Sequence, residues 1–440
     1  MKWSEPASVR VVEAVVAAFR DSAERSRECL SAIPQRDWAR SYFWLDASGL
    51  TLYFLNQLEM LAIEDSIPVA TLERLRRNFA DNRLRSSAMF AEFASINQAF
   101  HAAGVDYANL KGFTLSPESC PHPALRRQLD FDFLVDGGHL EICREILVES
   151  GYVLTAATKT TWEFKAGLTE QGGMKDFYKS TPQRSVELHF ASSSTAAPSP
   201  SRDERLDRLV LRSWGGLTFP ALSPSEQLVG QALHLFGHLC GASTRPGWIL
   251  EYKNHVSFYY NDLDFWDDVK ERSRTHRHAP IAIGLASLLS SRLFDGKTPS
   301  RLDDWTLDSL PAPIRLWAEH YGPRTVLADF PGTKLYLLLL QELERDDDTR
   351  PSQAQRRRRL LPLHRAPRIV YAGPDDNPWK WFRRELYQAR FVLFRLRFHV
   401  VEGIRYLIEA ARWKRQLPTL DDPPKDRRYL VTSGPRHAKE

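Results

Sequence analysis

The chain has few cysteines and no long apolar runs. Its 440 residues include only 4 cysteines, none of them in a C-x-x-C pair. This scatter argues against a structural zinc site and fits a reducing compartment. No stretch has the ~18 apolar residues that a membrane-spanning helix needs, and the opening M-K-W-S-E-P lacks the apolar core of a signal peptide. We therefore expect a cytoplasmic protein, with contact at a membrane surface left open.

Positive charge is concentrated near the C-terminal end. The formal net charge is +5, yet residues 356–415 hold sixteen Lys and Arg against five Asp and Glu, so the remainder is net negative. Residues 379–416 read as one helix with an apolar stripe, edged by Arg383, Arg390 and Arg397 at seven-residue intervals. A basic amphipathic helix of this kind can lie on an anionic membrane, bind nucleic acid phosphates or dock on its own acidic chain.

The most informative stretch runs from residue 105 to residue 135. An apolar run closes on Lys111-Gly112, and a later strand reads D-F-D-F-L-V. Because successive strand side chains point to opposite faces, Asp130 and Asp132 share one face and the phenylalanines the other. Two carboxylates held so close repel each other unless a cation lies between them. Their oxygens suit Mg²⁺ or Mn²⁺, which predicts chemistry on a phosphate. The alternative is a D-x-D pair at a sheet edge that only faces water.

The motifs around this pair resemble a known family. L-K-G followed by R-x-x-x-D-x-D-x-L-V is similar to the bacterial family usually labelled uncharacterised nucleotidyltransferase, within the nucleotidyltransferase-fold superfamily. The resemblance covers roughly residues 80–290. The matching residues are Leu110, Lys111, Gly112, Arg126, Asp130, Asp132, Leu134 and Val135, then Gly151-Tyr152 and Glu187-Leu188-His189.

The resemblance implies a transferase that moves a nucleoside monophosphate from an NTP such as ATP to an acceptor and releases pyrophosphate. It implies that Asp130, Asp132 and Glu187 are catalytic and hold Mg²⁺ or Mn²⁺, with Glu187 completing the site or orienting the acceptor. His189 would be a base, a substrate contact or part of the scaffold. The acceptor is not readable from the sequence; a small molecule and a protein side chain both fit.

The resemblance also implies that Lys111, Gly112 and Arg126 hold the triphosphate. A glycine lets the backbone approach a phosphate, and the following helix could offer its N-terminal N–H groups. Related enzymes usually have a small hydroxyl residue after the glycine, whereas Phe113 stands there in this chain. The alternative for Lys111 is a solvated side chain, and for Arg126 a surface residue that neutralises the acidic strand.

We expect an α+β architecture, with a mixed sheet flanked by helical subdomains on both sides. Met89, Phe93, Ile96 and Phe100 recur at helical spacing and predict an amphipathic helix from Asn82 to His101, packed on the sheet. Strands are expected at residues 161–164 and 174–178, and helices dominate after residue 202. The predicted regions are an N-terminal helical subdomain (1–80), a nucleotidyltransferase-fold core (81–192), a helical acceptor-binding subdomain (203–343), a basic linker (344–378), a basic amphipathic helix (379–417) and a disordered tail (418–440).

Two helical features of the acceptor-binding region add to this interpretation. His234 and His238 lie four residues apart on one helix face, but no third ligand is nearby in sequence, which favours core or substrate-lining histidines over a metal site. Glu251 matches an acid on a tryptophan-containing helix of the family. A rival hypothesis is a catalytically inactive binding or regulatory protein of the same fold, whose basic helix docks on a membrane surface or on nucleic acid.

Overall fold

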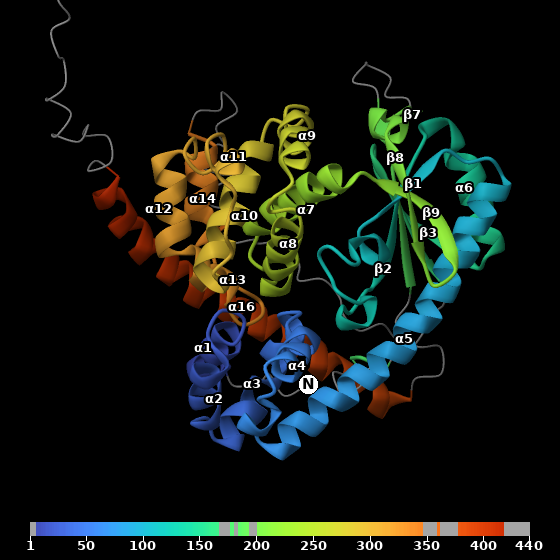
Figure 1. Ribbon diagram of the computed structural model, residues 1–440. Helices are drawn as coiled ribbons and strands as arrows, with labels where there is room; N and C mark the ends of the chain where they lie inside the picture. The colour runs from blue at the N-terminus through green and yellow to red at the C-terminus, as the bar shows by residue number, and fades with distance from the viewer. Residues whose placement is uncertain are drawn as a thin grey trace, which may run out of the picture. The chain divides into compact units, whose positions relative to one another are not determined.

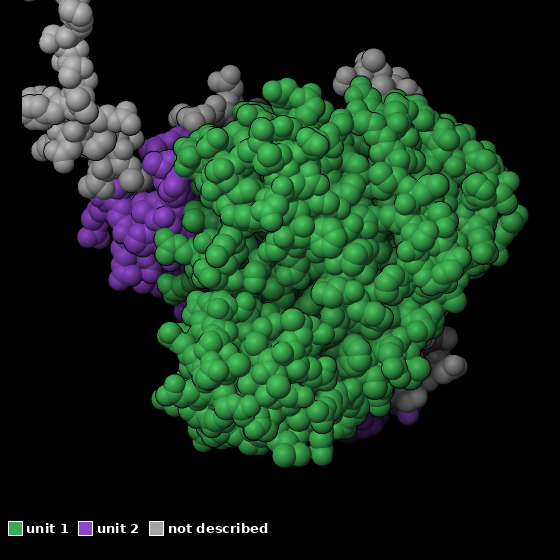
Figure 2. All heavy atoms as spheres, in the orientation of Figure 1, with its two compact units in different colours: residues 1–239, 243–310, 322–332 green, residues 240–242, 311–321, 333–440 purple. Residues whose placement is uncertain are grey.

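The structure is a computed structural model that describes residues 6–166, 177–179, 184–192, 200–345, 359–360 and 377–417. The chain divides into two compact units, coloured separately in Figure 2. Unit 1 comprises residues 1–239, 243–310 and 322–332. Unit 2 comprises residues 240–242, 311–321 and 333–440.

A seven-stranded mixed sheet forms the centre of unit 1 (Figure 1). Its strand order is β3-β4-β5-β2-β1-β9-β8, with the pairs β2·β5 and β1·β9 parallel and the other pairs antiparallel. A separate short ladder joins β6 (Ala191–Ser192) to β7 (Pro200–Ser201). The α+β class expected from the sequence is confirmed. The strands of the large sheet are β1 (Tyr107–Leu110), β2 (Asp130–Val135), β3 (Tyr152–Ala157), β4 (Thr161–Ala166), β5 (Arg184–His189), β8 (Leu209–Trp214) and β9 (Leu217–Leu222).

One face of the sheet is covered by α5 (Val69–Ala102) and α6 (Leu140–Glu149). The ring of Phe133 on β2 lies 5.2 Å from that of Phe100 and 6.3 Å from that of Phe93, both on α5. The predicted stripe Met89, Phe93, Ile96 and Phe100 is therefore buried in the core. Because the phenylalanines of β2 occupy this face, the alternating aspartates must lie on the opposite face.

Helix α5 is longer than the sequence indicated. It begins at Val69, directly after Pro68, and continues through the expected start at Asn82 to Ala102 (Figure 1). Residues 69–102 contain neither proline nor glycine, so no residue type interrupts the helix. Gly104, with a positive φ of 66°, follows its C-terminal end. The helices before it are α1 (Val9–Ala17), α2 (Ala23–Ser31), α3 (Gln35–Ala47) and α4 (Thr51–Met60).

The hairpin β8–β9 corrects the expectation that helices dominate from residue 203. Trp214 pairs with Leu217 across Gly215-Gly216, whose φ values of 56° and 81° suit a two-residue hairpin turn. The two glycines were a readable turn signal.

After the hairpin, unit 1 continues with α7 (Pro224–Leu239), α8 (Pro246–Phe258), α9 (Leu263–Ser273), α10 (Ala279–Phe294), α11 (Ser300–Asp303) and α13 (Gly322–Val326). Short 3₁₀ helices are η1 (Glu64–Ser66), η2 (Gly112–Leu115), η3 (Pro123–Leu125), η4 (Gly137–His139) and η6 (Glu204–Asp207).

Unit 2 is built from α12 (Ala312–His320), α14 (Tyr336–Leu343) and α16 (Pro378–Gln416). The basic helix expected near the C-terminus is α16. Its Trp413 donates from Nε1 to Glu342 Oε1 of α14 at 2.9 Å. Three expected segments lie largely or wholly outside the described residues. These are most of the linker, the tail at 418–440, and the strand at 174–178 except for residues 177 and 178. Among the described helices, none has the length and apolar character to cross a membrane.

Candidate active site

The register of β2 and β5 brings the predicted acids together. Asp132 pairs with Glu187 in the parallel ladder, so the two side chains project from the same face of the sheet. On its other side Asp132 pairs with Leu110, the last residue of β1. Asp130, two residues earlier, lies on the same face and is half-buried. The alternation read from D-F-D-F therefore positions these side chains as expected.

Asp132 is the best-shielded member of this group, at 5% exposure. Its Oδ1 lies 3.2 Å from Lys111 Nζ and 3.1 Å from His189 Nε2. The same His189 nitrogen is 3.5 Å from Glu187 Oε2. Within the described residues, the side chains grouped closely enough to hold one metal ion are Asp132, Glu187 and His189, whose ligand atoms lie within 4.8 Å of one another. Asp130 lies outside that group of three.

The two aspartates differ in their affinity for a proton. Burial and the charge of Asp132 raise the pKa of Asp130 above its ordinary value. Burial acts against the charged form of Asp132 too, but the His189 hydrogen bond and the Lys111 charge outweigh it and lower the pKa of Asp132. The pKa of His189 is raised because its bonds to Asp132 and Glu187 outweigh its burial. One carboxylate is thus kept charged and its neighbour resists ionisation.

The turn after β1 is tightly packed. Lys111 and Gly112 both have positive φ values, 52° and 55°. A Cβ on Gly112 would lie 2.5 Å from Gln128 Nε2, which donates to the Asp130 carbonyl at 2.9 Å. A side chain here would therefore displace the Gln128 amide and impose a Cβ at a backbone conformation that favours glycine. The helix expected after the glycine is only the four-residue 3₁₀ helix η2, because the Thr114 N–H and hydroxyl both bond back to the Lys111 carbonyl.

Arg126 forms its ion pair with an acid of α8. Its Nε donates to Glu251 Oε1 of α8 at 3.1 Å, and Tyr53 of α4 donates to the same oxygen at 2.9 Å. Burial disfavours the charge of Arg126, but Glu251 and Asp130 outweigh it and raise the pKa of Arg126. The sequence singled out Arg126 and Glu251 separately. It had no signal for their contact or for Tyr53, which precedes Glu251 by 198 positions.

A cavity of about 380 Å³ opens beside Lys111 and His189. Its opposite wall comes from α7, including Gln231 and His234. His234 packs against His238 at 4.7 Å between ring centroids, and burial lowers the pKa of His234 to about 3. Of the two predicted helical histidines, His234 thus lines the cavity that adjoins the acidic group, and His238 packs against it.

These features define the class: a mixed sheet carrying carboxylates on adjacent strands, next to a glycine turn, as in nucleotidyltransferases. The family model described as "Uncharacterised nucleotidyltransferase" matches residues 34–294, and the chain belongs to this family. The match confirms the resemblance read from the sequence. It begins at residue 34 rather than near residue 80, and so it includes α3 and α4.

Two solved structures share low similarity with this chain. The crystal structure of the lincosamide antibiotic adenylyltransferase LnuA, bound to lincomycin, is 13% identical, covering 40% of this chain and 96% of that one, with a TM-score of 0.26. An antigenic nucleotidyltransferase-like protein from Paracoccidioides brasiliensis is 12% identical, covering 48% of this chain and 93% of that one, with a TM-score of 0.27. Comparison with curated proteins finds no match.

Proposed function

We propose that the protein is a metal-dependent nucleotidyltransferase that moves an NMP from an NTP to an acceptor and releases pyrophosphate. One observation carries the proposal: Asp132 and Glu187 stand in register on adjacent parallel strands, with Asp130 on the same face. Strand β2 pairs with β1, which leads directly into the turn at Lys111-Gly112. The family membership supports the same reaction class.

The donor set fits a hard divalent cation. Asp130, Asp132 and Glu187 offer carboxylate oxygens, which Mg²⁺ and Mn²⁺ prefer. His189 adds a nitrogen to the group. A bound divalent ion would neutralise charge that develops on the transferred phosphate. Lys111, at 3.2 Å from Asp132, lies close enough to pair with a phosphate oxygen once that carboxylate has another partner.

The transfer itself needs little from the protein beyond placement and charge. The acceptor atom bonds to the α-phosphorus, and the bond to the bridging oxygen breaks with its electron pair leaving on pyrophosphate. The acceptor's proton, where it has one, passes to Glu187 or to water. Lys111, the Gly112 turn and Arg126 would hold the triphosphate, so that attacking and leaving oxygens stay in line.

The cavity of about 380 Å³ is the place for the acceptor. It adjoins Lys111 and His189, and the wall from α7 combines Leu233 and Val229 with the polar ends of Gln231 and His234. A volume of this size suits a small molecule or an inserted protein side chain. A hydroxyl, phosphate or amine of that acceptor would face the acidic group.

A second candidate function rests on α16. Its exposed side carries large apolar side chains, among them Trp379, Leu393 and Ile404 at 67%, 64% and 56% exposure. Apolar surface of this extent on a basic helix is typical of a docking face. The candidate is peripheral contact of residues 379–417 with an anionic membrane, with or without catalysis; nucleic acid is the other anionic partner.

Calorimetric titration with Mg²⁺-ATP and Mg²⁺-GTP tests the enzyme proposal. The wild type should bind at least one of them, and Asp130→Asn with Asp132→Asn should lose the metal-dependent part of that binding. Asp264→Asn, at an exposed acid of α9, is the matched control. Equal binding by all three proteins, or none by the wild type, would contradict the proposal. Mass spectrometry of extracts incubated with the bound nucleotide would then identify the acceptor by its added mass.

A further inference from the structure

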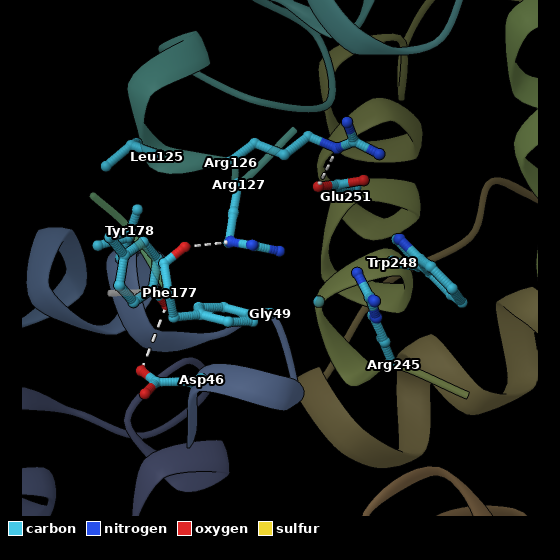
Figure 3. Close-up of a pocket in the computed structure, with 12 residues that line it drawn as sticks. Asp46, Gly49, Leu125, Arg126, Arg127, Phe177, Tyr178, Arg245, Trp248 and Glu251 are labelled. Carbon is cyan, nitrogen blue, oxygen red and sulfur yellow. Dashed lines mark hydrogen bonds and ion pairs between the residues drawn. The ribbon is translucent and has the colours of Figure 1, made fainter. Parts of the chain in front are cut away.

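A second cavity in unit 1 is lined by more positive than negative groups (Figure 3). Three arginines reach it: Arg126 and Arg127, which precede β2, and Arg245, which precedes α8. Its aromatic walls are Phe177, Tyr178 and Trp248. This cavity is distinct from the one that adjoins Lys111 and His189, since the two have no lining residue in common.

The carboxylates that line this cavity already have partners. Glu251 accepts from Arg126 and from Tyr53, as described above. Asp46 is bound by Arg74 and accepts from Thr51 at 3.0 Å. The negative charge of both groups is therefore taken up by residues other than Arg127 and Arg245.

Arg127 and Arg245 make no ion pair in the part of the chain that the structure describes. The guanidinium of Arg127 lies 3.5 Å from the Phe177 ring centroid, and its Nε donates to the Phe177 carbonyl at 2.7 Å. That of Arg245 lies 5.1 Å from the Trp248 ring centroid. Figure 3 shows both guanidinium groups directed into the space between the N-terminal helices and α8. Each keeps several N–H donors for another partner.

Holding these cations together is unfavourable without an anion. Burial and the charge of Arg85 lower the pKa of Arg127 to about 10. Burial and the charge of Arg126 lower the pKa of Arg245. A guanidinium pKa falls only where its charged form is poorly stabilised. An anion that accepted from both groups would remove this cost.

We propose that this cavity, of about 40 Å³, binds a terminal phosphate of the NTP, with Arg127 and Arg245 as the two phosphate-binding residues. The assignment rests on the proposed nucleotidyl transfer. Arg126 and Arg127 line the cavity and lie four and three positions before Asp130, so the cavity adjoins the start of the acidic strand. Planar guanidinium groups match phosphate oxygens in pairs. The triphosphate would thus extend from the Lys111-Gly112 turn past Arg126 toward Arg245, and the acceptor would enter from the His189 side.

Calorimetry with inorganic triphosphate in EDTA tests this site without any contribution from a metal ion. The full-length wild type should bind triphosphate, and adenosine should bind at least about 10-fold more weakly. Arg127→Gln and Arg245→Gln should each weaken triphosphate binding by about 10- to 100-fold, which is the effect expected for a lost charge-assisted hydrogen bond. Arg301→Gln, at an exposed arginine paired with Asp267, is the matched control. Circular dichroism and thermal melting establish that each variant is folded.

The outcomes separate this site from the transferase proposal. Triphosphate binding that is unchanged in the double variant Arg127→Gln with Arg245→Gln, or absent in the wild type, overturns the phosphate site. The transferase proposal survives either result if Mn²⁺ binding still requires Asp130 and Asp132. Triphosphate binding that depends on both arginines, with no Mn²⁺ bound at the acids, supports the anion site and counts against the transferase.

Discussion

Two carboxylates two residues apart on one strand have opposite electrostatic environments. Asp132 faces Lys111 and His189, both within 3.2 Å of one oxygen, and stays charged. Asp130 is half-buried next to that charge, and its pKa is raised. A divalent ion would reverse the second effect, because it stabilises the ionised form of both side chains. Without a metal ion, the charged form of Asp132 is thus already stabilised, whereas the charged form of Asp130 depends on the ion.

Glu187 and Glu163 give a matched pair of acids for testing the metal site. They stand directly opposite each other on β5 and β4. Glu163 is already paired with Lys165 at 2.7 Å, whereas Glu187 approaches His189 and Asp132. We expect Glu187→Gln to weaken Mn²⁺ binding by about 10-fold or more, the loss of one charged ligand. Glu163→Gln should leave it within about 2-fold. Mn²⁺ titration followed by electron paramagnetic resonance measures both, and equal losses would place the ion elsewhere.

His255 of α8 provides a prediction about pH. It is fully buried, and its Nδ1 accepts from Gln231 Nε2 at 2.8 Å. Burial lowers its pKa from 6.5 to about 4. The unfolded chain therefore binds this proton first as the pH falls, and the stability that His255 contributes is lost between about pH 6.5 and 4. From about pH 7.5 to 5 the free energy of unfolding should fall by about 2 kcal/mol on this account.

Urea unfolding at the two pH values measures this loss. His255→Gln removes the titrating group, so the decrease in stability between the two pH values should shrink by about 2 kcal/mol relative to the wild type. His101→Gln, at an exposed position of α5, is the control and should keep the wild-type decrease. A decrease of the same size in both variants would show that His255 is not the group responsible.

At the scale of elements, the sequence predicted what local periodicity determines. The stripe of α5 and the alternation of β2 follow from spacing alone, and both hold. The hairpin β8–β9 was missed although Gly215-Gly216 marks its turn, because its strand sequences, L-V-L-R-S-W and L-T-F-P-A-L, do not alternate strictly between apolar and polar residues. The contact between Arg126 and Glu251 joins residues 125 positions apart, and no local pattern contains that information.

The turn after β1 tests how the elements of the site are held together. Gly112→Ala would add a Cβ at 2.5 Å from Gln128 Nε2 and impose a side chain at a φ of 55°. Gln128 would have to give up its hydrogen bond to the Asp130 carbonyl. Gly104 has a similar φ, 66°, but a Cβ added by Gly104→Ala would have no atom within 4 Å. Both should lose about 1 kcal/mol of stability for the backbone conformation, and Gly112→Ala about 1 kcal/mol more for the lost bond.

Thermal or chemical unfolding of the two variants measures this difference. The double variant Gly112→Ala with Gln128→Ala removes the clash. It should therefore be less stable than Gln128→Ala by the backbone penalty alone, at most about 1 kcal/mol. If Gly112→Ala and Gly104→Ala prove equally stable, Gln128 moves aside at no cost, and the close approach does not hold the turn.

At the scale of the molecule, unit 1 brings together residues that we assigned from the sequence to three separate regions. Tyr53 comes from the expected N-terminal subdomain, Arg126 from the expected core and Glu251 from the expected acceptor-binding subdomain. All three meet at one carboxylate oxygen. The family match from residue 34 to residue 294 spans the same segments. The limits of the predicted subdomains stay a prediction, but residues from all three regions contact one another within unit 1.

The last prediction concerns helix α16, which packs one side within unit 2 and exposes apolar side chains on another. Trp413 and Glu409 are buried there, with Glu409 accepting from Tyr321 at 3.2 Å. Leu393, Ile404 and Leu407 remain 64%, 56% and 58% exposed on a helix rich in arginine. Vesicles that contain phosphatidylserine should therefore retain the full chain on sedimentation, and vesicles of phosphatidylcholine alone should retain less.

Replacing Leu393, Ile404 and Leu407 by glutamate should reduce vesicle binding by about 10-fold or more, since it removes apolar area and adds like charge facing the lipid. Leu211→Glu, at the exposed leucine of β8, is the control and should bind as the wild type does. Raising the salt concentration should weaken binding of the wild type, because part of the attraction comes from the arginines. Retention that is equal for the triple variant and the wild type would exclude this face as the lipid contact, and binding to single-stranded RNA with no vesicle binding would assign it to nucleic acid.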